Sequence, residues 1–214
     1  YLYKIDIIMK NKNILVFGST GFIGRSLSKR LLQNGAKLLC PVRNPYRVKR
    51  NILSGDIGQI DIIEFDINNL DEIKTSIEKA DFVINLVGIL YEKPNVSFEL
   101  AHYLLPKKIS IYCELYKKPF IHISSLGSLY NTKSNYLYSK KMGEEYIETN
   151  NSNYIIIRPS TVYGEEDKFF NLFGKMAKIL PFLPLIKKGK TKFQPIYVND
   201  LSLLIFNLLK YFDK

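Results

Sequence analysis

A glycine-rich turn at residues 18–24 constrains the fold of this chain more than any other feature of its sequence. The turn reads Gly-Ser-Thr-Gly-Phe-Ile-Gly, follows the apolar run 13–17 and opens a segment of helical periodicity that ends at Gly35. In such a strand–turn–helix unit the three glycines permit a tight turn, close approach of a pyrophosphate, and close helix–strand packing. The helix N-terminus adds unpaired N–H groups and the positive end of its dipole. We predict a dinucleotide-binding turn, with a merely tight strand–helix connection as the alternative. The residues assigned to the cofactor are Gly18, Thr20, Gly21, Phe22, Ile23 and Gly24.

Strands and helices alternate through the first 160 residues. Apolar runs predict further strands at 37–42, 60–67, 81–88, 119–125 and 153–160, and helical periodicity predicts helices at 70–79, 96–117, 136–150 and about 200–212. Because the strands are apolar almost throughout, they suit a parallel sheet that is covered on both faces. The alternation therefore predicts an α/β protein with a doubly wound parallel sheet of the Rossmann type.

The rhythm breaks after about residue 160. A length of 214 residues allows one to one and a half domains. We divide the chain into an N-terminal extension (1–11), an NADP-binding sheet domain (12–164) and a small or truncated C-terminal lobe (165–214) that faces substrate or membrane.

The end of the second predicted strand indicates which dinucleotide is bound. An NAD site places an acidic residue about 20 residues after the glycine turn, where it holds the ribose 2′-hydroxyl. This chain has Arg43 there, further basic residues at 47, 49 and 50, and no acidic residue between the glycine turn and Asp56. A guanidinium pairs well with a 2′-phosphate, and Arg25 could assist. We predict NADP(H), with NAD(H) as the alternative if the basic loop is merely solvated.

Tyr136 and Lys140 form a Tyr-x-x-x-Lys pair in a predicted helix. Side chains four residues apart share one face of a helix, so the lysine can lower the tyrosine pKa and bind the nicotinamide ribose. The tyrosine then acts as general acid and base toward a carbonyl or alcohol. Both residues are therefore predicted to serve catalysis and cofactor binding.

The spacing G-x-x-G-x-x-G, the Tyr-x-x-x-Lys pair and the segment Arg158–Gly164 resemble the extended and atypical short-chain dehydrogenase/reductases. The resemblance implies a substrate-polarising serine at Ser125, or at Ser124 instead, which completes a catalytic set with Tyr136 and Lys140. It also places His102 where these families carry an asparagine of the proton relay, and this departure counts against ordinary catalysis. We interpret His102 as a buried, hydrogen-bonded helix residue and His122 as structural. The further cofactor contacts that the resemblance implies are Asp66 and Ile67 at the adenine, Leu86, Val87 and Gly88 at its ribose, and Pro159 at the carboxamide.

A closer resemblance extends over residues 12–212. The segments YGEEDKFF at 163–170 and KFQP at 192–195, with Val198 and Asp200, are similar to the accessory subunit of respiratory complex I (NADH:ubiquinone oxidoreductase) and its alphaproteobacterial relatives. That family implies tightly held NADPH, other complex I subunits as partners, and a mainly structural or assembly role. It implies a location on the cytoplasmic face of a bacterial inner membrane, or alternatively on the matrix side of the mitochondrial inner membrane. Retention of the serine, tyrosine and lysine keeps residual reductase activity open.

The net charge of +11 invites nucleic acid or anionic lipid as a partner. No nucleic-acid motif is present, so we predict no such partner. The segment LPFLPLIKKGKTK at 180–192 combines apolar and basic residues and could touch lipid or membrane subunits, or form a loop over the cofactor. Two histidines and two cysteines without ligand spacing predict no metal. Two other functions stay open: a free-standing NADP-dependent reductase, epimerase or dehydratase, and a nucleotide-sensing regulator, against which the retained Tyr136 and Lys140 count.

Overall fold

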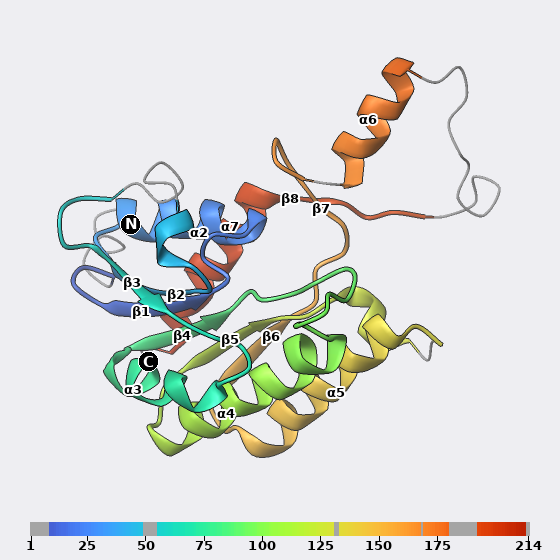
Figure 1. Ribbon diagram of the computed structural model, residues 1–214. Helices are drawn as coiled ribbons and strands as arrows, with labels where there is room; N and C mark the ends of the chain where they lie inside the picture. The colour runs from blue at the N-terminus through green and yellow to red at the C-terminus, as the bar shows by residue number, and fades with distance from the viewer. Residues whose placement is uncertain (1–8, 49–54, 131–132, 168, 180–191, 213–214) are drawn as a thin grey trace.

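The computed structural model describes residues 9–48, 55–130, 133–167, 169–179 and 192–212. Its centre is a six-stranded parallel sheet in the order β3-β2-β1-β4-β5-β6 (Figure 1), which confirms the predicted doubly wound α/β fold. The strands are β1 (Asn13–Phe17), β2 (Lys37–Val42), β3 (Ile60–Glu64), β4 (Phe82–Asn85), β5 (Phe120–Ile123) and β6 (Tyr154–Ile157). Strands β1 to β3 are added toward one edge of the sheet, and β4 to β6 toward the other, so the strand order reverses between β1 and β4. In such sheets ligands bind at the carboxyl ends of the strands beside this reversal.

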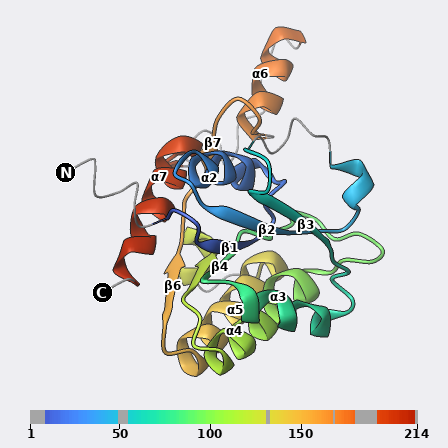
Figure 2. The same ribbon diagram turned by 90° about the vertical axis from the view of Figure 1, so that its left-hand side faces the viewer.

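Helices cover both faces of the sheet (Figures 1 and 2). One face carries α2 (Phe22–Gln33) and α7 (Val198–Leu208), and the other carries α3 (Ile73–Lys79), α4 (Leu105–Leu115) and α5 (Asn135–Asn150). Single 3₁₀ turns lie at Pro45–Arg47, Leu70–Glu72, Leu126–Leu129 and Leu209–Tyr211. Within the described ranges no helix has the length and apolar character that a membrane crossing needs.

The central strand β1 shows why the strands read as unbroken apolar runs. Ile14 and Val16 point into the core beneath α2 and α7, whereas Leu15 and Phe17 point into the core beneath α3, α4 and α5. All four side chains are buried. Because successive residues of a strand face opposite sides, a strand covered on both faces must be apolar at every position.

The predicted helix at 96–117 differs in its first half. A π-helical turn (Leu100–Leu104) precedes α4. Proline accounts for it: Pro106 has no N–H to donate to the carbonyl of His102 four residues earlier, and its ring would clash with that carbonyl in a regular α-helix. The His102 carbonyl lies against α5, where a Cβ on Gly143 would stand only 2.1 Å from the carbonyl oxygen. The wider turn and this glycine let the two helices approach closely.

The last fifty residues leave the sheet and return to it. After β6 the chain forms β7 (Val162–Tyr163), which pairs with β8 (Ile196–Tyr197), and between them α6 (Phe169–Ile179) stands away from the sheet (Figure 1). The final helix α7 then packs on α2, where the Ser26 hydroxyl donates to Asn199 Oδ1 at 2.8 Å. The proposed C-terminal lobe thus contributes its last helix to the core of the sheet domain.

Candidate nucleotide site

The glycine turn has the geometry that a phosphate-binding turn needs. Gly18 has a φ of +81°, in the left-handed region that glycine favours. A Cβ on Gly24 would stand 2.1 Å from the Gly18 carbonyl oxygen, so only glycine fits where α2 passes the turn. Gly21 is the N-cap of α2, and no acidic residue occupies the first helical turn. The helix N-terminus therefore presents its dipole with no carboxylate of its own first turn beside it, next to Thr20, Phe22 and Ile23.

Arg25 does not lie free beside the turn. Its guanidinium donates to the Thr20 carbonyl oxygen at 2.7 Å and pairs with Glu166, from the segment between β7 and α6. Gly164 of the same segment would meet the Phe22 ring at 3.2 Å if it carried a Cβ. The expectation that Arg25 assists with a 2′-phosphate is thus not supported. Its contacts instead fasten the segment after β7 to the start of α2.

The carboxyl end of β2 places Arg43 on the surface. Among the residues that the structure describes, Arg43 forms no hydrogen bond or ion pair, so its guanidinium is available to a ligand. The residues at 49 and 50 of the same basic cluster, and the Arg47 side chain, lie outside the described part of the chain.

Asp66 and Ile67 follow β3 at the same edge of the sheet. The exposed Asp66 carboxylate accepts hydrogen bonds from the backbone and side-chain nitrogens of Asn68 at 3.0 and 2.9 Å, and these bonds lower its pKa. Ile67 is different, because its side chain is 6% exposed and packs in the core with Phe65. The expectation that Ile67 packs on an adenine ring stays a prediction, and only the small exposed part of this side chain could make that contact.

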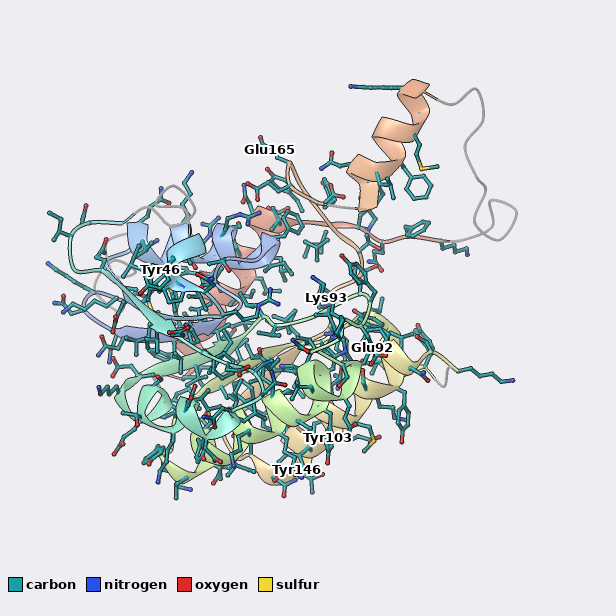
Figure 3. The ribbon with its side chains drawn as sticks, in the orientation of Figure 1. Tyr46, Glu92, Lys93, Tyr103, Tyr146 and Glu165 are labelled. Carbon is teal, nitrogen blue, oxygen red and sulfur yellow. The ribbon has the colours of Figure 1, made fainter. Side chains whose placement is uncertain are left out.

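A hollow of about 440 Å³ lies beside this turn, near the labelled Glu92 and Lys93 (Figure 3). Asn68 lines it from one side. The remaining lining residues come from the chain after β4: Glu92, Lys93, Pro94, Asn95, Val96, Ser97 and Leu100. Because Asn68 also bonds to Asp66, the hollow adjoins the adenine end of the predicted cofactor site.

The turn after β4 brings Leu86, Val87 and Gly88 past the glycine turn. A Cβ on Gly18 would stand 3.2 Å from the backbone carbon of Leu86, and the Val87 N–H donates to Asn85 Oδ1 at 3.0 Å. Gly88 is exposed, and its missing Cβ would lie 3.6 Å from Lys140 Nζ. The glycine turn, the turn after β4 and Lys140 of α5, all predicted to bind the cofactor, thus meet at the carboxyl ends of β1 and β4.

Ser125, Tyr136 and Lys140 come together as predicted from the sequence. Ser125 follows β5, and the other two lie in the first turns of α5, whose N-cap is Ser134. Burial raises the Tyr136 pKa, and a hydrogen bond with Ser125 lowers it by a smaller amount. The prediction that Lys140 lowers this pKa is therefore wrong for the structure, in which the pKa is raised overall. Lys140 Nζ lies 5.7 Å from the centre of the Tyr136 ring, and the alternative Ser124 is buried. The set can exchange a proton with a carbonyl or alcohol placed at the Tyr136 hydroxyl.

Lys140 makes the stability of the protein depend on pH. Burial lowers the pKa of its ammonium from 10.5 to about 8, against the opposing effect of Glu144. Between these two values the unfolded chain binds a proton that the folded chain has released, so the free energy of unfolding rises with pH from 8 to 10.5. Lys140→Met removes the buried cation and keeps the side-chain length. It is expected to raise the free energy of unfolding at pH 7 by about 1–3 kcal/mol.

Urea denaturation between pH 7 and 10.5 measures this effect. In Lys140→Met the contribution of this lysine to the rise with pH should vanish. The control is Lys141→Met at the neighbouring lysine, whose side chain is 41% exposed. A Lys140→Met protein that is less stable than wild type at pH 7 would show that the ammonium is a net stabilising group.

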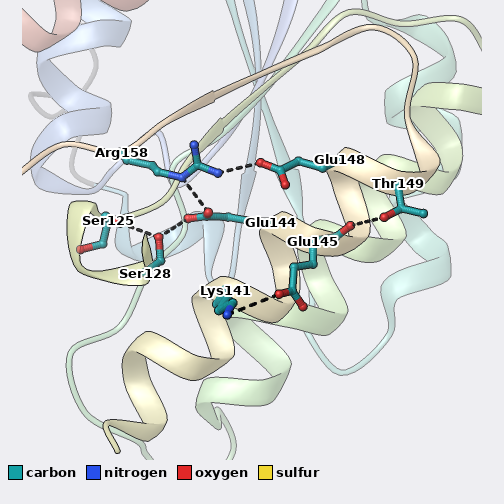
Figure 4. Close-up of polar contacts among 8 residues, drawn as sticks. All are labelled: Ser125, Ser128, Lys141, Glu144, Glu145, Glu148, Thr149 and Arg158. Carbon is teal, nitrogen blue, oxygen red and sulfur yellow. Dashed lines mark hydrogen bonds and ion pairs between the residues drawn. The ribbon is translucent and has the colours of Figure 1, made fainter. Parts of the chain in front are cut away.

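Glu144, a buried carboxylate on α5 that the sequence analysis did not single out, helps to hold the loop that carries Ser125. Glu144 is 3% exposed, and its carboxylate accepts from Arg158 Nε at 2.7 Å and lies 2.5 Å from the Ser128 hydroxyl (Figure 4). That hydroxyl also lies 2.7 Å from the Ser125 carbonyl oxygen. Pro159 joins the same arrangement, since its carbonyl oxygen accepts from Leu126 N–H at 3.0 Å. The loop that carries Ser125 is thus held from α5 and from the end of β6.

Both histidines are buried. His102 is bonded through both ring nitrogens, which confirms the interpretation of a buried, hydrogen-bonded helix residue. His122 lies in β5, where its Nδ1 is 3.2 Å from Asn85 Nδ2, and burial lowers its pKa well below the ordinary value.

Residues 14–214 match the NAD dependent epimerase/dehydratase family. NADH dehydrogenase [ubiquinone] 1 alpha subcomplex subunit 9, mitochondrial, is 38% identical in Arabidopsis thaliana and 36% identical in Mus musculus. Each match covers 91% of this chain, and 49% and 52% of those proteins. The ceramide reductase of Caulobacter vibrioides is 25% identical over 87% of this chain and 57% of that protein. The chain spans about half the length of the curated relatives that it matches.

Solved structures share the fold. Pen from Bacillus thuringiensis superposes with a TM-score of 0.79 at 20% identity, over 95% of this chain and 67% of that one. WbmG from Bordetella bronchiseptica, solved in complex with NAD, has a TM-score of 0.71 at 14% identity, over 93% and 69%. The predicted relation to complex I accessory subunits is confirmed as sequence similarity, and the chain belongs to the NAD dependent epimerase/dehydratase family.

Proposed function

We propose that this chain is the nucleotide-binding part of an accessory subunit of respiratory complex I, in which a firmly held NADP(H) serves a structural or assembly role. The similarity to mitochondrial complex I subunits across 91% of the chain carries the proposal. The glycine turn and the segments that converge on it support the nucleotide. In this proposal Gly18, Thr20, Gly21, Phe22, Ile23 and Gly24 hold the phosphates, and the adenosine half contacts Asp66, Leu86, Val87 and Gly88. Tyr136, Lys140 and Pro159 take the nicotinamide half, and Ile67 contributes mainly backbone.

NADP(H) is preferred over NAD(H) in this proposal because Arg43 is exposed and unpaired within the described residues and no carboxylate occupies its position. Arg43→Ala should weaken NADPH binding by about tenfold and change NADH binding by less than about twofold, since one charge-assisted phosphate contact is lost. Titration of intrinsic NAD(P)H fluorescence measures both. Lys37→Ala, an exposed residue at the opposite end of β2, is the control. Wild-type protein that binds NADH more tightly than NADPH would reject the preference.

The proposed partners are other subunits of complex I. The relatives are named as mitochondrial proteins. For this chain we propose the cytoplasmic face of a bacterial inner membrane, with the matrix side of a mitochondrial inner membrane as the alternative. A tagged chain expressed in its own source should sediment with NADH:ubiquinone oxidoreductase activity in detergent gradients. Sedimentation as a small free protein would contradict the proposal.

We further propose that the lobe around α6 faces the membrane or the membrane subunits. Leu172 on α6 is 56% exposed and Phe193 is 46% exposed. In the sequence no acidic residue lies between Asp167 and Asp200, whereas lysines are frequent there. Apolar side chains among lysines suit an anionic lipid surface. Residues 180–191, which the sequence predicts to touch lipid or membrane subunits, lie outside the described part of the chain.

A free-standing NADP-dependent reductase, epimerase or dehydratase is the second candidate, and the assembled Ser125, Tyr136 and Lys140 favour it. Tyr136 would donate its phenolic proton to the substrate oxygen while a bound NADPH supplies a hydride. Oxidation of NADPH by small carbonyl compounds, followed by the loss of NADPH absorbance, tests the reductase hypothesis. Turnover that Tyr136→Phe abolishes would establish an enzyme.

A further inference from the structure

His102 occupies a protected place between the two halves of the candidate site. It lies in the π-helical turn before α4, is 1% exposed, and stacks on Phe98 with a ring separation of 5.5 Å. Its ring also meets the Tyr136 ring edge-on at 5.3 Å. A single extra residue in a helical turn of this kind re-aims side chains, and such turns are frequent at functional sites.

Both ring nitrogens of His102 are engaged, and their partners define the tautomer. The Ile89 N–H donates to Nε2 at 3.0 Å, so Nε2 carries no proton. Nδ1 lies 2.9 Å from the Ser139 hydroxyl, which itself donates to the Tyr136 carbonyl oxygen at 2.9 Å. The hydroxyl oxygen must therefore accept, and Nδ1 bears the ring proton. Burial, with a smaller contribution from Lys140, lowers the His102 pKa to about 3, so this neutral form persists at neutral pH.

These bonds join the two segments that meet beside Lys140. Ile89 follows Gly88 in the turn after β4, and Ser139 lies between Tyr136 and Lys140 on α5. The missing Cβ of Gly88 would lie 3.6 Å from Lys140 Nζ and 3.9 Å from His102 Nε2. The His102 backbone is fixed as well, because its carbonyl packs against Gly143. One imidazole thus spans the gap between the turn and the helix.

We propose that His102 is a positioning residue that sets the spacing between the Gly88–Ile89 turn and the Tyr136–Lys140 turn of α5, and thereby the affinity for the nicotinamide half of a dinucleotide. The proposal rests on the proposed nucleotide-binding function. It assigns His102 no contact with the reacting atoms, since both of its ring nitrogens are bonded to protein.

The test compares NADPH affinity in four variants. His102→Phe keeps a ring and loses both bonds. It leaves the Ile89 N–H without its partner and the Ser139 hydroxyl with only the Tyr136 carbonyl, and should weaken NADPH binding at least about tenfold. His102→Gln can accept through its amide oxygen and donate through its amide nitrogen, so affinity should return to within about threefold of wild type. Ser139→Ala, which removes one partner without altering the ring, should give an intermediate loss. It serves in place of His102→Phe if that variant does not fold.

Asn151→Ala is the matched control. The Asn151 amide donates to Ser110 at 3.3 Å, so it joins the C-terminal end of α5 to the middle of α4, away from His102. This variant should lose stability and keep NADPH affinity within about twofold. Affinity that falls in Asn151→Ala as much as in His102→Phe, or a glutamine that does not rescue, would overturn the proposal.

A readout without nucleotide separates this proposal from the proposed function. Nitrogen-15 NMR of wild-type protein should show Nδ1 of His102 protonated and Nε2 unprotonated. The Ile89 amide should exchange with solvent slowly in wild type and at least about tenfold faster in His102→Phe. If wild-type protein binds no dinucleotide but these signals are as expected, the proposed function fails and the positioning geometry stands. Unchanged exchange in His102→Phe would refute the geometry itself.

Discussion

Gly24→Ala is expected to abolish dinucleotide binding, with a loss of affinity above about a hundredfold, and to lower the free energy of unfolding by about 1–3 kcal/mol. The added methyl carbon would stand 2.1 Å from the Gly18 carbonyl oxygen and 2.7 Å from that of Ser19. Both are backbone atoms that cannot rotate aside, so α2 must move away from the turn or the turn must open. Either movement displaces the N–H groups that would face the phosphates. Calorimetric titration with NADPH and urea denaturation measure the two effects.

Gly174→Ala is the matched control for this prediction. Gly174 lies inside α6, and no atom would come within 4 Å of its added Cβ. Alanine is the better helix former, so the variant should be unchanged or more stable by up to about 1 kcal/mol. A Gly24→Ala protein that binds NADPH as tightly as the Gly174→Ala protein would mean that this turn does not hold the phosphates.

Glu144→Gln is expected to lower the free energy of unfolding by about 2 kcal/mol. The variant keeps the size of the side chain but leaves Arg158 with a neutral partner and weakens the bond with Ser128. Removal of one member of a buried pair costs about 3–5 kcal/mol, and the estimate is reduced because the Arg158 side chain is 27% exposed and keeps Glu148. Because Ser128 contacts the Ser125 carbonyl, the Ser125 loop should also loosen, with faster amide exchange at residues 126–128. Urea denaturation and hydrogen exchange measure the two effects.

Glu148→Gln tests whether the burial of Glu144 is the cause of the stability loss expected in Glu144→Gln. Glu148 pairs with the same guanidinium at 2.7 Å, but its side chain is 43% exposed. Solvent screens such a pair, so the loss should stay below about 1 kcal/mol. Equal losses in the two variants would show that Arg158 depends on total carboxylate charge and not on the buried bonds of Glu144.

The sequence predicted the strands and helices of the sheet domain, whereas α6, β7 and β8 were not predicted. All six strands of the sheet were predicted, although most end earlier than expected. The third was predicted to reach Ile67, yet β3 stops at Glu64 because the chain turns at Asp66, whose carboxylate bonds to Asn68. An aspartate often bonds to the backbone two residues later in a turn, so the pair Asp66 and Asn68 was a sequence signal for an earlier end of this strand.

The parts of the site that were missed depend on contacts between distant segments. Glu144 lies four residues after Lys140, so its place on the same helix face was readable, but its pairing with Arg158 depends on how α5 lies beside β6. Pro106 could have signalled the irregular helix. The bonds of His102 to Ile89 and Ser139 required the packed structure. The burial of the Ile67 side chain also depends on tertiary packing, because Ile67 lies in the core with Phe65.

The packing of α7 on α2 has a consequence for the order in which the chain can fold during synthesis. Leu27 and Leu31 of α2 share a core with Leu201 and Ile205 of α7. The two helices lie far apart in the sequence: Ser26 of α2 and Asn199 of α7, which are hydrogen-bonded, are separated by 173 residues. A ribosome makes roughly 5–20 residues per second, so about ten seconds or more pass before α7 exists. During that interval the apolar face of α2 is uncovered, and a nascent chain of this kind is a natural client for chaperones.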